Sequence, residues 1–422
     1  MTNSHTQNSI AVIGAGAAGI SAAHYLSRKY SVDLYESGPD IGGHVVTVMA
    51  DDNGSTIPVD MGFIVFNKRN YPCFCRLIQE LNVESASTDM SFSYSEPGSG
   101  FAYSGHSLSA LFASRTNIIN PRFWKMLVSI ARFNHSILKD LKAGSIQDTT
   151  LGKYVSMHGY HPVLFERYLE PMIKAIWSAE EEGAEKFPLK RFADFFANHG
   201  LLGIRDRPRW QYIKGGSHTY VKAFKKKFSG RVLTSTPVRA ITRTSSGPEV
   251  HLDSGKFQYK AAVIACHADD ALNLLHQPDH VERALLSLWQ YTTNEVILHT
   301  DETFLPPNKR AWACWNYIAE PEKEHKKVNV HYWMNMLQNF KASLNHVVSL
   351  NPRTPVKRDR INHHQNMTHP CFTTQAVNSQ SDLAQLQGRG GIYFCGSYHG
   401  NGFHEDAIAS GVKAAQMLGV RI

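Results

Sequence analysis

Three glycines lie close together near the N-terminus, in the sequence Gly14-Ala-Gly16-Ala-Ala-Gly19. Glycine at the first position permits a tight turn, and at the second it lets the backbone approach a pyrophosphate. At the third it allows a helix to pack closely on a strand. Ala17 and Ala18 begin the helix that follows, whose free N–H groups and partial positive charge favour a phosphate. The spacing therefore predicts a dinucleotide-binding turn.

The elements around this turn are those that such a site requires. Residues 9–13 form a short apolar run of strand length, residues 20–26 have a helical pattern, and residues 31–35 read as a second strand ending at Glu36. A carboxylate at that position accepts hydrogen bonds from ribose hydroxyls and repels a 2′-phosphate, which argues against NADP. A chance glycine-rich turn would not carry all of these neighbours.

Two further glycine-rich segments favour FAD over NAD. Gly42-Gly43-His44 follows Glu36 by six residues, and a predicted strand at 391–395 leads through a glycine-rich turn into a helix from about residue 405 to 418. A long cofactor needs a second contact far along the chain, and a helix N-terminus there stabilises the negative charge of a reduced flavin.

In the last helix we expect backbone N–H groups to face the flavin, while Glu405 and Asp406 point away and cap the helix. The predicted cofactor-binding residues are Gly14, Gly16, Ala17, Ala18, Gly19, Glu36, Gly42, Gly43, His44, Val238, Gly396, Ser397, Gly402, Phe403, His404, Glu405 and Asp406.

With these motifs the sequence resembles the flavin-containing amine oxidase superfamily, whose relatives include protoporphyrinogen oxidases and carotenoid desaturases. It is most similar to a bacterial branch described as predicted NAD/FAD-binding or amine oxidase-like proteins. The resemblance spans nearly the whole chain, and its internal carriers are Asp60-Met-Gly-Phe63, Trp315-Asn-Tyr317, Tyr332-Trp-Met-Asn335, Asn351-Pro352 and His369-Pro370. Genes of this branch often neighbour cyclopropane-fatty-acyl synthase genes, which implies a lipid acyl substrate.

The chain departs from the superfamily pattern at two positions. His44 stands where an arginine is usual, and Ser397 stands where an acid usually holds the flavin's ribityl chain. Covalent flavin linkages in this superfamily use a Cys or His at set positions. Cys395 lies inside a predicted strand and is expected to pack there as a small hydrophobic residue, not to bond to the flavin. We therefore expect FAD to bind non-covalently.

The substrate site is less clear from the sequence. Trp315, Tyr317, Tyr332 and Trp333, with the polar Asn335, are candidates for a substrate-binding cage, although aromatic residues of this kind also form cores. Because a flavin accepts the hydride, the protein need only supply a base for a proton, and His369 or His404 is predicted for that role.

The order of the predicted elements gives the fold class and the domains. The fold is predicted to be α/β: a Rossmann-type FAD-binding domain assembled from separated segments, with an inserted α+β substrate domain, as in amine oxidases. The predicted FAD-binding domain comprises residues 8–75, 212–285 and 385–422. The predicted substrate domain comprises residues 76–211 and 286–384, in which residues 351–382, with three prolines, are expected to form a long loop.

Composition excludes several classes of protein. The 422 residues are 42% hydrophobic, as expected of a folded chain, and 44 basic against 36 acidic residues give a net charge of +8. No apolar run reaches the roughly 18 residues of a membrane span, and the first nine residues lack the pattern of a secretory signal. Six scattered cysteines indicate reduced thiols and no zinc site, so we expect no metal and a cytoplasmic location.

Two basic stretches with aromatic residues bear on partners, namely Arg122-Phe-Trp-Lys125 and Lys222-Ala-Phe-Lys-Lys-Lys-Phe228. They are typical either of a solvated helix face or of peripheral docking on the anionic inner face of a membrane. No nucleic-acid-binding module accompanies them, and the oligomeric state stays open.

The predicted function is an FAD-dependent oxidoreductase that abstracts hydride from a carbon centre, with a lipid acyl chain favoured. An amine oxidase, and a non-redox isomerase or lipid-handling protein, are the alternatives. An NAD dehydrogenase would not need the C-terminal glycine-rich block.

Overall fold

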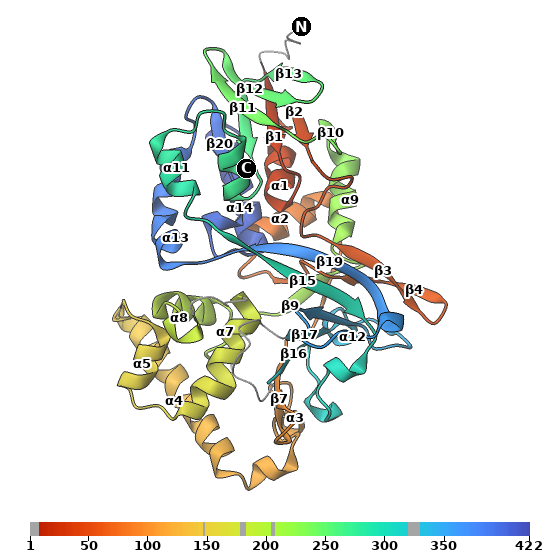
Figure 1. Cartoon of the computed structure of the whole chain (residues 1–422), viewed down its shortest axis with the longest axis vertical. Coiled ribbons are helices and arrows are strands. Elements are labelled where there is room, and N and C mark those ends of the chain that lie inside the picture. The colour runs from red at the N-terminus through yellow and green to blue at the C-terminus, as the bar shows by residue number, and fades with distance from the viewer. Residues whose placement is uncertain (1–7, 147, 178–182, 204–206, 320–329) are drawn as a thin grey trace.

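A five-stranded parallel sheet forms the upper part of the molecule in Figure 1. In the computed structural model, which describes residues 8–146, 148–177, 183–203, 207–319 and 330–422, its strand order is β10, β2, β1, β14, β20. These strands are β10 Arg231–Leu233, β2 Ser31–Tyr35, β1 Ser9–Ile13, β14 Ala261–Ile264 and β20 Ile392–Phe394. Separated segments therefore join one sheet, as predicted for a Rossmann-type core.

Helices and a small sheet cover the two faces of this parallel sheet. Side chains of α1, α2, α9 and α14 pack together with residues of β1, β2 and β14. Residues of the small sheet β11–β13, with α10 and α11, pack on the opposite face. Since the central strands are buried on both faces, they are continuous apolar runs in the sequence.

The second main sheet has seven strands in the order β19, β15, β18, β17, β16, β7, β8. These are β19 Ile361–Pro370, β15 Tyr291–His299, β18 Val347–Leu350, β17 Val330–Trp333, β16 Trp315–Ile318, β7 Phe92–Glu96 and β8 Phe101–Ser104. Neighbouring strands are antiparallel except β16 and β7, which are parallel. Figure 1 shows β19 and β15 crossing the middle of the molecule, between the parallel sheet and the helices below.

The expected long loop over residues 351–382 is wrong. It contains β19, which pairs along its length with β15, followed by α13. The strand lies at the edge of the sheet and only Met367 of its ten residues is fully buried. Its sequence therefore lacks the apolar alternation that marks a strand with one face in a core.

A helical layer lies at the opposite end of the molecule from the parallel sheet (Figure 1). Its core contains Phe133 of α4 with Phe192 and Phe196 of α8. Asn120 caps the start of α4, and Gly144 ends it with a positive φ of 62°. Among the described residues, no helix is both long and apolar enough to cross a membrane.

The remaining helices and strands have the following bounds. The helices are α1 Ala17–Leu26, α2 Pro72–Leu81, α3 Leu108–Leu111, α4 Pro121–Ala143, α5 Leu151–Met157, α6 Pro162–Leu164, α7 Glu170–Trp177, α8 Leu189–Asn198, α9 His218–Lys227, α10 Ala268–Leu274, α11 His280–Leu286, α12 Met334–Leu337, α13 Thr374–Asn378 and α14 His404–Met417. The other strands are β3 Thr47–Asp52, β4 Ser55–Asp60, β5 Val65–Asn67, β6 Ser85–Ser87, β9 Trp210–Ile213, β11 Ala240–Thr244, β12 Gly247–Leu252 and β13 Gly255–Gln258.

Candidate active site

The turn between β1 and α1 leaves an open space in front of the helix. Gly14 has a φ of +95°, and a Cβ on Gly19 would overlap the carbonyl oxygen of Gly14. A Cβ on Gly16 would instead meet no atom within 4 Å. Gly16 is the N-cap of α1. As a glycine it makes no side-chain capping bond, and no acidic residue lies in the first turn of the helix. The N–H groups in the first turn of α1 thus have no side-chain cap, which fits the pyrophosphate of FAD.

Glu36 lies at the end of β2 with its carboxylate against this turn. Its Oε2 accepts the backbone N–H of Ala15 at 2.9 Å and its Oε1 accepts that of Gly38 at 2.8 Å. The side chain therefore shapes the cradle itself, and its predicted bond to ribose stays a prediction.

The second glycine pair passes directly beside the first turn. The N–H of Gly42 donates to the carbonyl of Ala15 at 2.8 Å, and a Cβ on Gly43 would lie 3.1 Å from Cα of Gly16. His44 then donates from Nε2 to the carbonyl of Thr368 at 2.9 Å. Burial lowers the pKa of His44, so a neutral ring stands where the superfamily usually has a cation.

At the C-terminal turn the two acids have different partners. Oδ2 of Asp406 accepts the N–H of Phe403 at 2.8 Å and so caps α14, as expected. Glu405 does not cap its own helix: it accepts the N–H groups of Cys73 and Phe74, at 2.8 and 2.9 Å, at the start of α2. Its longer side chain reaches the neighbouring helix and satisfies that helix's free donors instead.

Gly402 is required by the shape of this turn. Its φ is +88°, and a Cβ there would lie 2.6 Å from the ring of Phe372. Gly396, at the end of β20, donates its N–H to Ser410 of α14 at 2.9 Å, and Ser397 is half-buried beside it. Val238 is half-buried just before β11 and packs on the core between the parallel sheet and the small sheet β11–β13.

Three histidines from three segments, His44, His267 and His369, lie beside one another near the glycine pair, and a fourth, His404, is buried among aromatic rings at the start of α14. The ring of His44 lies 5.3 Å from that of His369 and 6.3 Å from that of His267. Burial and the neighbouring imidazoles lower the pKa of His369 to about 4, and they lower that of His404 to about 3. The group is therefore uncharged at neutral pH.

His404 is held firmly by its neighbours. Its ring stacks on Phe63 with centroids 3.7 Å apart, and its Nε2 lies 3.0 Å from the hydroxyl of Tyr220. These contacts favour a packing role over that of the predicted base.

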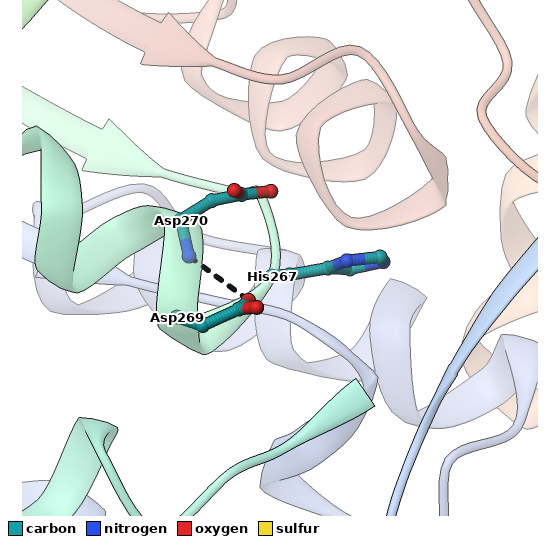
Figure 2. A group of neighbouring side chains, drawn as sticks. All are labelled: His267, Asp269 and Asp270. Atoms are coloured by element: carbon teal, nitrogen blue, oxygen red, sulfur yellow. Dashed lines mark hydrogen bonds between the residues drawn. The ribbon is translucent and has the colours of Figure 1, made fainter. Parts of the chain in front are cut away.

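His267 is not among the site residues predicted from the sequence. It follows β14 at the carboxyl end of a parallel strand, where ligand-binding residues gather in such sheets, and that position was an available signal. His267, Asp269 and Asp270 have potential ligand atoms within 4.8 Å of one another. Figure 2 shows the imidazole extending away from the helix that carries the two carboxylates. The ring stacks on Tyr291 at 4.0 Å, so this arrangement indicates a packed ring and not a metal centre.

The five predicted substrate residues do not come together. Trp315 lies opposite Tyr332 across β16 and β17, with their rings edge to face at 4.9 Å. Tyr317 shares this face but stacks on Tyr94 within a core cluster.

Trp333 and Asn335 instead line a surface cavity of about 540 Å³ with Trp312 and Phe340. Trp333 also donates from Nε1 to Oδ1 of Asn345 at 3.0 Å. Successive strand residues point to opposite faces, which separates Trp333 from Tyr332. Trp315 and Tyr332 remain the candidates for a substrate-binding cage. Among the described residues, the indole N–H of Trp315 is buried without a hydrogen-bond partner.

The comparison with known families decides the class of the protein. Residues 17–341 match the family described as flavin containing amine oxidoreductase. The chain belongs to this family. Membership confirms the predicted flavin cofactor and the predicted oxidoreductase class, with FAD fitting the glycine cradle described above.

No curated protein sequence matches the chain. Solved structures of other proteins do share its fold. Cyclohexylamine oxidase from Brevibacterium oxydans IH-35A has a TM-score of 0.70 and 15% identity, covering 97% of this chain and 98% of its own. A triple mutant of putrescine oxidase has a TM-score of 0.69 and 13% identity, covering 97% and 98%. A fatty acid isomerase from P. acnes that produces CLA has a TM-score of 0.69 and 13% identity, covering 99% and 100%.

Proposed function

We propose that this flavoprotein removes a hydride from a carbon centre of a lipid acyl chain. The observation that carries the proposal is the group of site histidines. Burial lowers the pKa of His44, His267, His369 and His404 alike, so the site disfavours positive charge. An ammonium substrate would have to lose its proton to enter such a site, whereas an acyl chain carries no charge. The fatty acid isomerase among the similar folds accords with this choice.

The chain's own residues would hold the cofactor at both of its ends. The Gly14–Gly19 turn and Glu36 would bind the pyrophosphate and ribose, and the N-terminus of α14 would lie at the flavin ring. FAD when bound supplies the hydride acceptor. Asp406 holds the first turn of α14 and leaves its other N–H groups free to face negative charge. Trp315 and Tyr332 would line the substrate side with the methionine and aliphatic side chains packed on them.

An exposed apolar face on α3, on the segment that follows it and on the start of α4 supports access to a membrane lipid. We name it the α3–α4 face, and it comprises Leu108 (78% exposed), Ile118 (50%), Ile119 (82%), Trp124 (46%) and Val128 (56%). The exposed cations Arg115, Arg122 and Lys125 lie among these residues in the sequence. Apolar side chains mixed with cations suit an anionic lipid surface. We propose that this face docks on the bilayer.

The lysine-rich α9 does not belong to that face. Its Phe224 is fully buried and Phe228 is half-buried, so its lysines have no exposed aromatic partner. Figure 1 places α9 beside the parallel sheet, at the other end of the molecule from α3 and α4. Its lysines fit a solvated helix face.

Anaerobic reduction of the flavin tests the proposed substrate class. The purified protein should be yellow and should release FAD on heating. We expect phospholipids with unsaturated or branched acyl chains to bleach the flavin band, while putrescine and cyclohexylamine do not. Bleaching by amines alone would overturn the proposal. A lipid product with a shifted double bond and no net oxidation would establish the isomerase instead.

Vesicle binding tests the α3–α4 face separately. Ile119→Glu and Trp124→Glu should each reduce co-sedimentation with anionic vesicles, while detergent-dispersed lipid still bleaches the flavin at the normal rate. Met157→Glu is the matched control, since Met157 is 65% exposed on α5 and lies outside this face. Equal loss of binding in the control would contradict the assignment.

A further inference from the structure

A chain of buried amide side chains crosses the edge of the seven-stranded sheet and ends at His369. Asn351 follows β18, Asn294 lies on β15, and His369 lies on β19. Nδ2 of Asn351 donates to Oδ1 of Asn294 at 2.7 Å, and Nδ2 of Asn294 lies 2.9 Å from Nδ1 of His369. Asn294 is 1% exposed and Asn351 is 6% exposed. Buried amides of this kind must use their hydrogen bonds in a defined orientation.

The backbone sets the direction of this chain. The N–H of Glu295 donates to Oδ1 of Asn351 at 2.9 Å. A backbone N–H is only a donor, so the amide oxygen of Asn351 must face it and the amide nitrogen must face Asn294. The oxygen of Asn294 accepts that bond, which turns its own nitrogen toward His369.

An amide nitrogen is also only a donor. Nδ1 of His369 must therefore accept, and a neutral imidazole that accepts at Nδ1 carries its proton on Nε2. Within the described part of the chain, Nε2 of His369 has no hydrogen-bond partner. The ring stands beside His44, immediately after the Gly42–Gly43 pair that borders the nucleotide cradle.

We propose that Asn351 and Asn294 are positioning residues that fix neutral His369 with its proton on Nε2, so that His369 donates a hydrogen bond into the active site. The base role predicted for His369 then fails, because Nδ1 is occupied by a donor and Nε2 already carries a proton. Burial beside His44 and His267 also keeps the ring neutral, with its pKa lowered to about 4. The inference does not depend on which substrate binds.

Nitrogen NMR of the full-length flavoprotein, labelled with ¹⁵N-histidine, measures this tautomer directly. His369→Gln identifies the signals of His369 by difference. We expect an unprotonated Nδ1 and a protonated Nε2 between pH 6 and 8. A protonated Nδ1, or an imidazolium in this range, would overturn the proposal without any measurement of activity.

Asn351→Gly tests the relay from a position that does not touch His369. Asn351 has a φ of +48°, which glycine adopts readily, so the variant removes the amide and keeps the backbone shape. Among the described residues other than His369, the side chain of Asn294 then keeps only the long 3.5 Å contact of its Nδ2 with the carbonyl of Thr292, so it can present either end of its amide to His369. We expect His369 to show both tautomers in comparable amounts. A folded variant that retains only the Nε2–H form would remove Asn351 from the relay.

Asn294→Asp reverses the last bond. The carboxylate accepts from Nδ1–H, so the proton should move to Nδ1 and the pKa of His369 should rise. Asn366→Asp is the matched control, because Asn366 is exposed and lies on β19, the strand of His369, three residues before it. It should leave the tautomer and the pKa unchanged. An unchanged Nε2–H form in Asn294→Asp would contradict the proposal.

Discussion

Gly16→Ala separates cofactor binding from folding at the nucleotide turn. The backbone of Gly16 is extended, with φ −74° and ψ −172°, a conformation that alanine adopts without strain. The added methyl group would meet no protein atom within 4 Å. It would instead occupy the space in front of α1 where the pyrophosphate is predicted to bind. The variant should therefore fold normally and bind FAD poorly.

The size of the effect follows from the bonds at risk. Each hydrogen bond from a backbone N–H to a charged phosphate contributes about 1.5–3 kcal/mol, so the loss of one raises the Kd of FAD by about 10- to 150-fold. Alanine restricts the unfolded chain, which adds about 0.4–1 kcal/mol to the unfolding free energy, but it is a poorer N-cap than glycine by a similar amount. The stability of the apoprotein should therefore stay within about 1 kcal/mol of the wild type. Titration of deflavinated protein with FAD gives the Kd, and urea unfolding gives the stability.

Two other glycines provide the controls. Gly105→Ala also meets no atom within 4 Å but lies between β8 and α3, so its Kd should match the wild type. In Gly19→Ala the methyl group would overlap the carbonyl of Gly14, so both stability and FAD binding should fall. Wild-type affinity in Gly16→Ala would refute the placement of the pyrophosphate at this turn.

Three further predictions concern the cofactor and the core. Glu36→Ala removes the predicted ribose acceptor, the bond to Ala15 in the turn and the bond to Gly38 after β2. The Kd of FAD, measured on deflavinated protein, should rise about tenfold or more, and an unchanged Kd would show that Glu36 does not bind ribose. Gly402→Val should lower flavin content or reduction potential, because the side chain would collide with Phe372 at a positive φ, and normal values of both would contradict this. Burial lowers the pKa of His299 to about 4 and that of His331 to about 3. Below pH 6.5 these histidines bind protons in the unfolded chain but not in the folded protein. The free energy of unfolding should therefore fall by roughly 2 kcal/mol per histidine between pH 7 and pH 5. Equal urea midpoints at the two pH values would contradict this prediction.

The parts of the fold that were predictable depend on short stretches of sequence. The turn at Gly14–Gly19 and the strands on either side are contiguous, and a parallel strand buried on both faces is an apolar run whatever its partners. The capping role of Asp406 is also local, since it bonds a residue three positions earlier. For the same reason β15 was visible and β19 was not: the polar edge strand is ordered by pairing with β15, and its own residues give no periodic signal.

Tertiary structure decided the contacts between distant segments. Glu405 could be placed on its helix from the sequence. Its bonds to Cys73 and Phe74 at the start of α2, 332 and 331 residues away, depend on how the two helices approach each other. The separation of Trp333 from Tyr332 follows from which face of β17 meets the core.

The sequence by itself determined that this chain binds a dinucleotide-type cofactor, because that signal needs only glycines, a helix start and an acid at fixed local spacing. The environment of the site histidines was decided by the fold alone. His44, His267, His369 and His404 come from four segments, and their low pKa values arise from shared burial. Desolvation and hydrogen-bond direction are properties of the surroundings in space, and the residue types do not specify them.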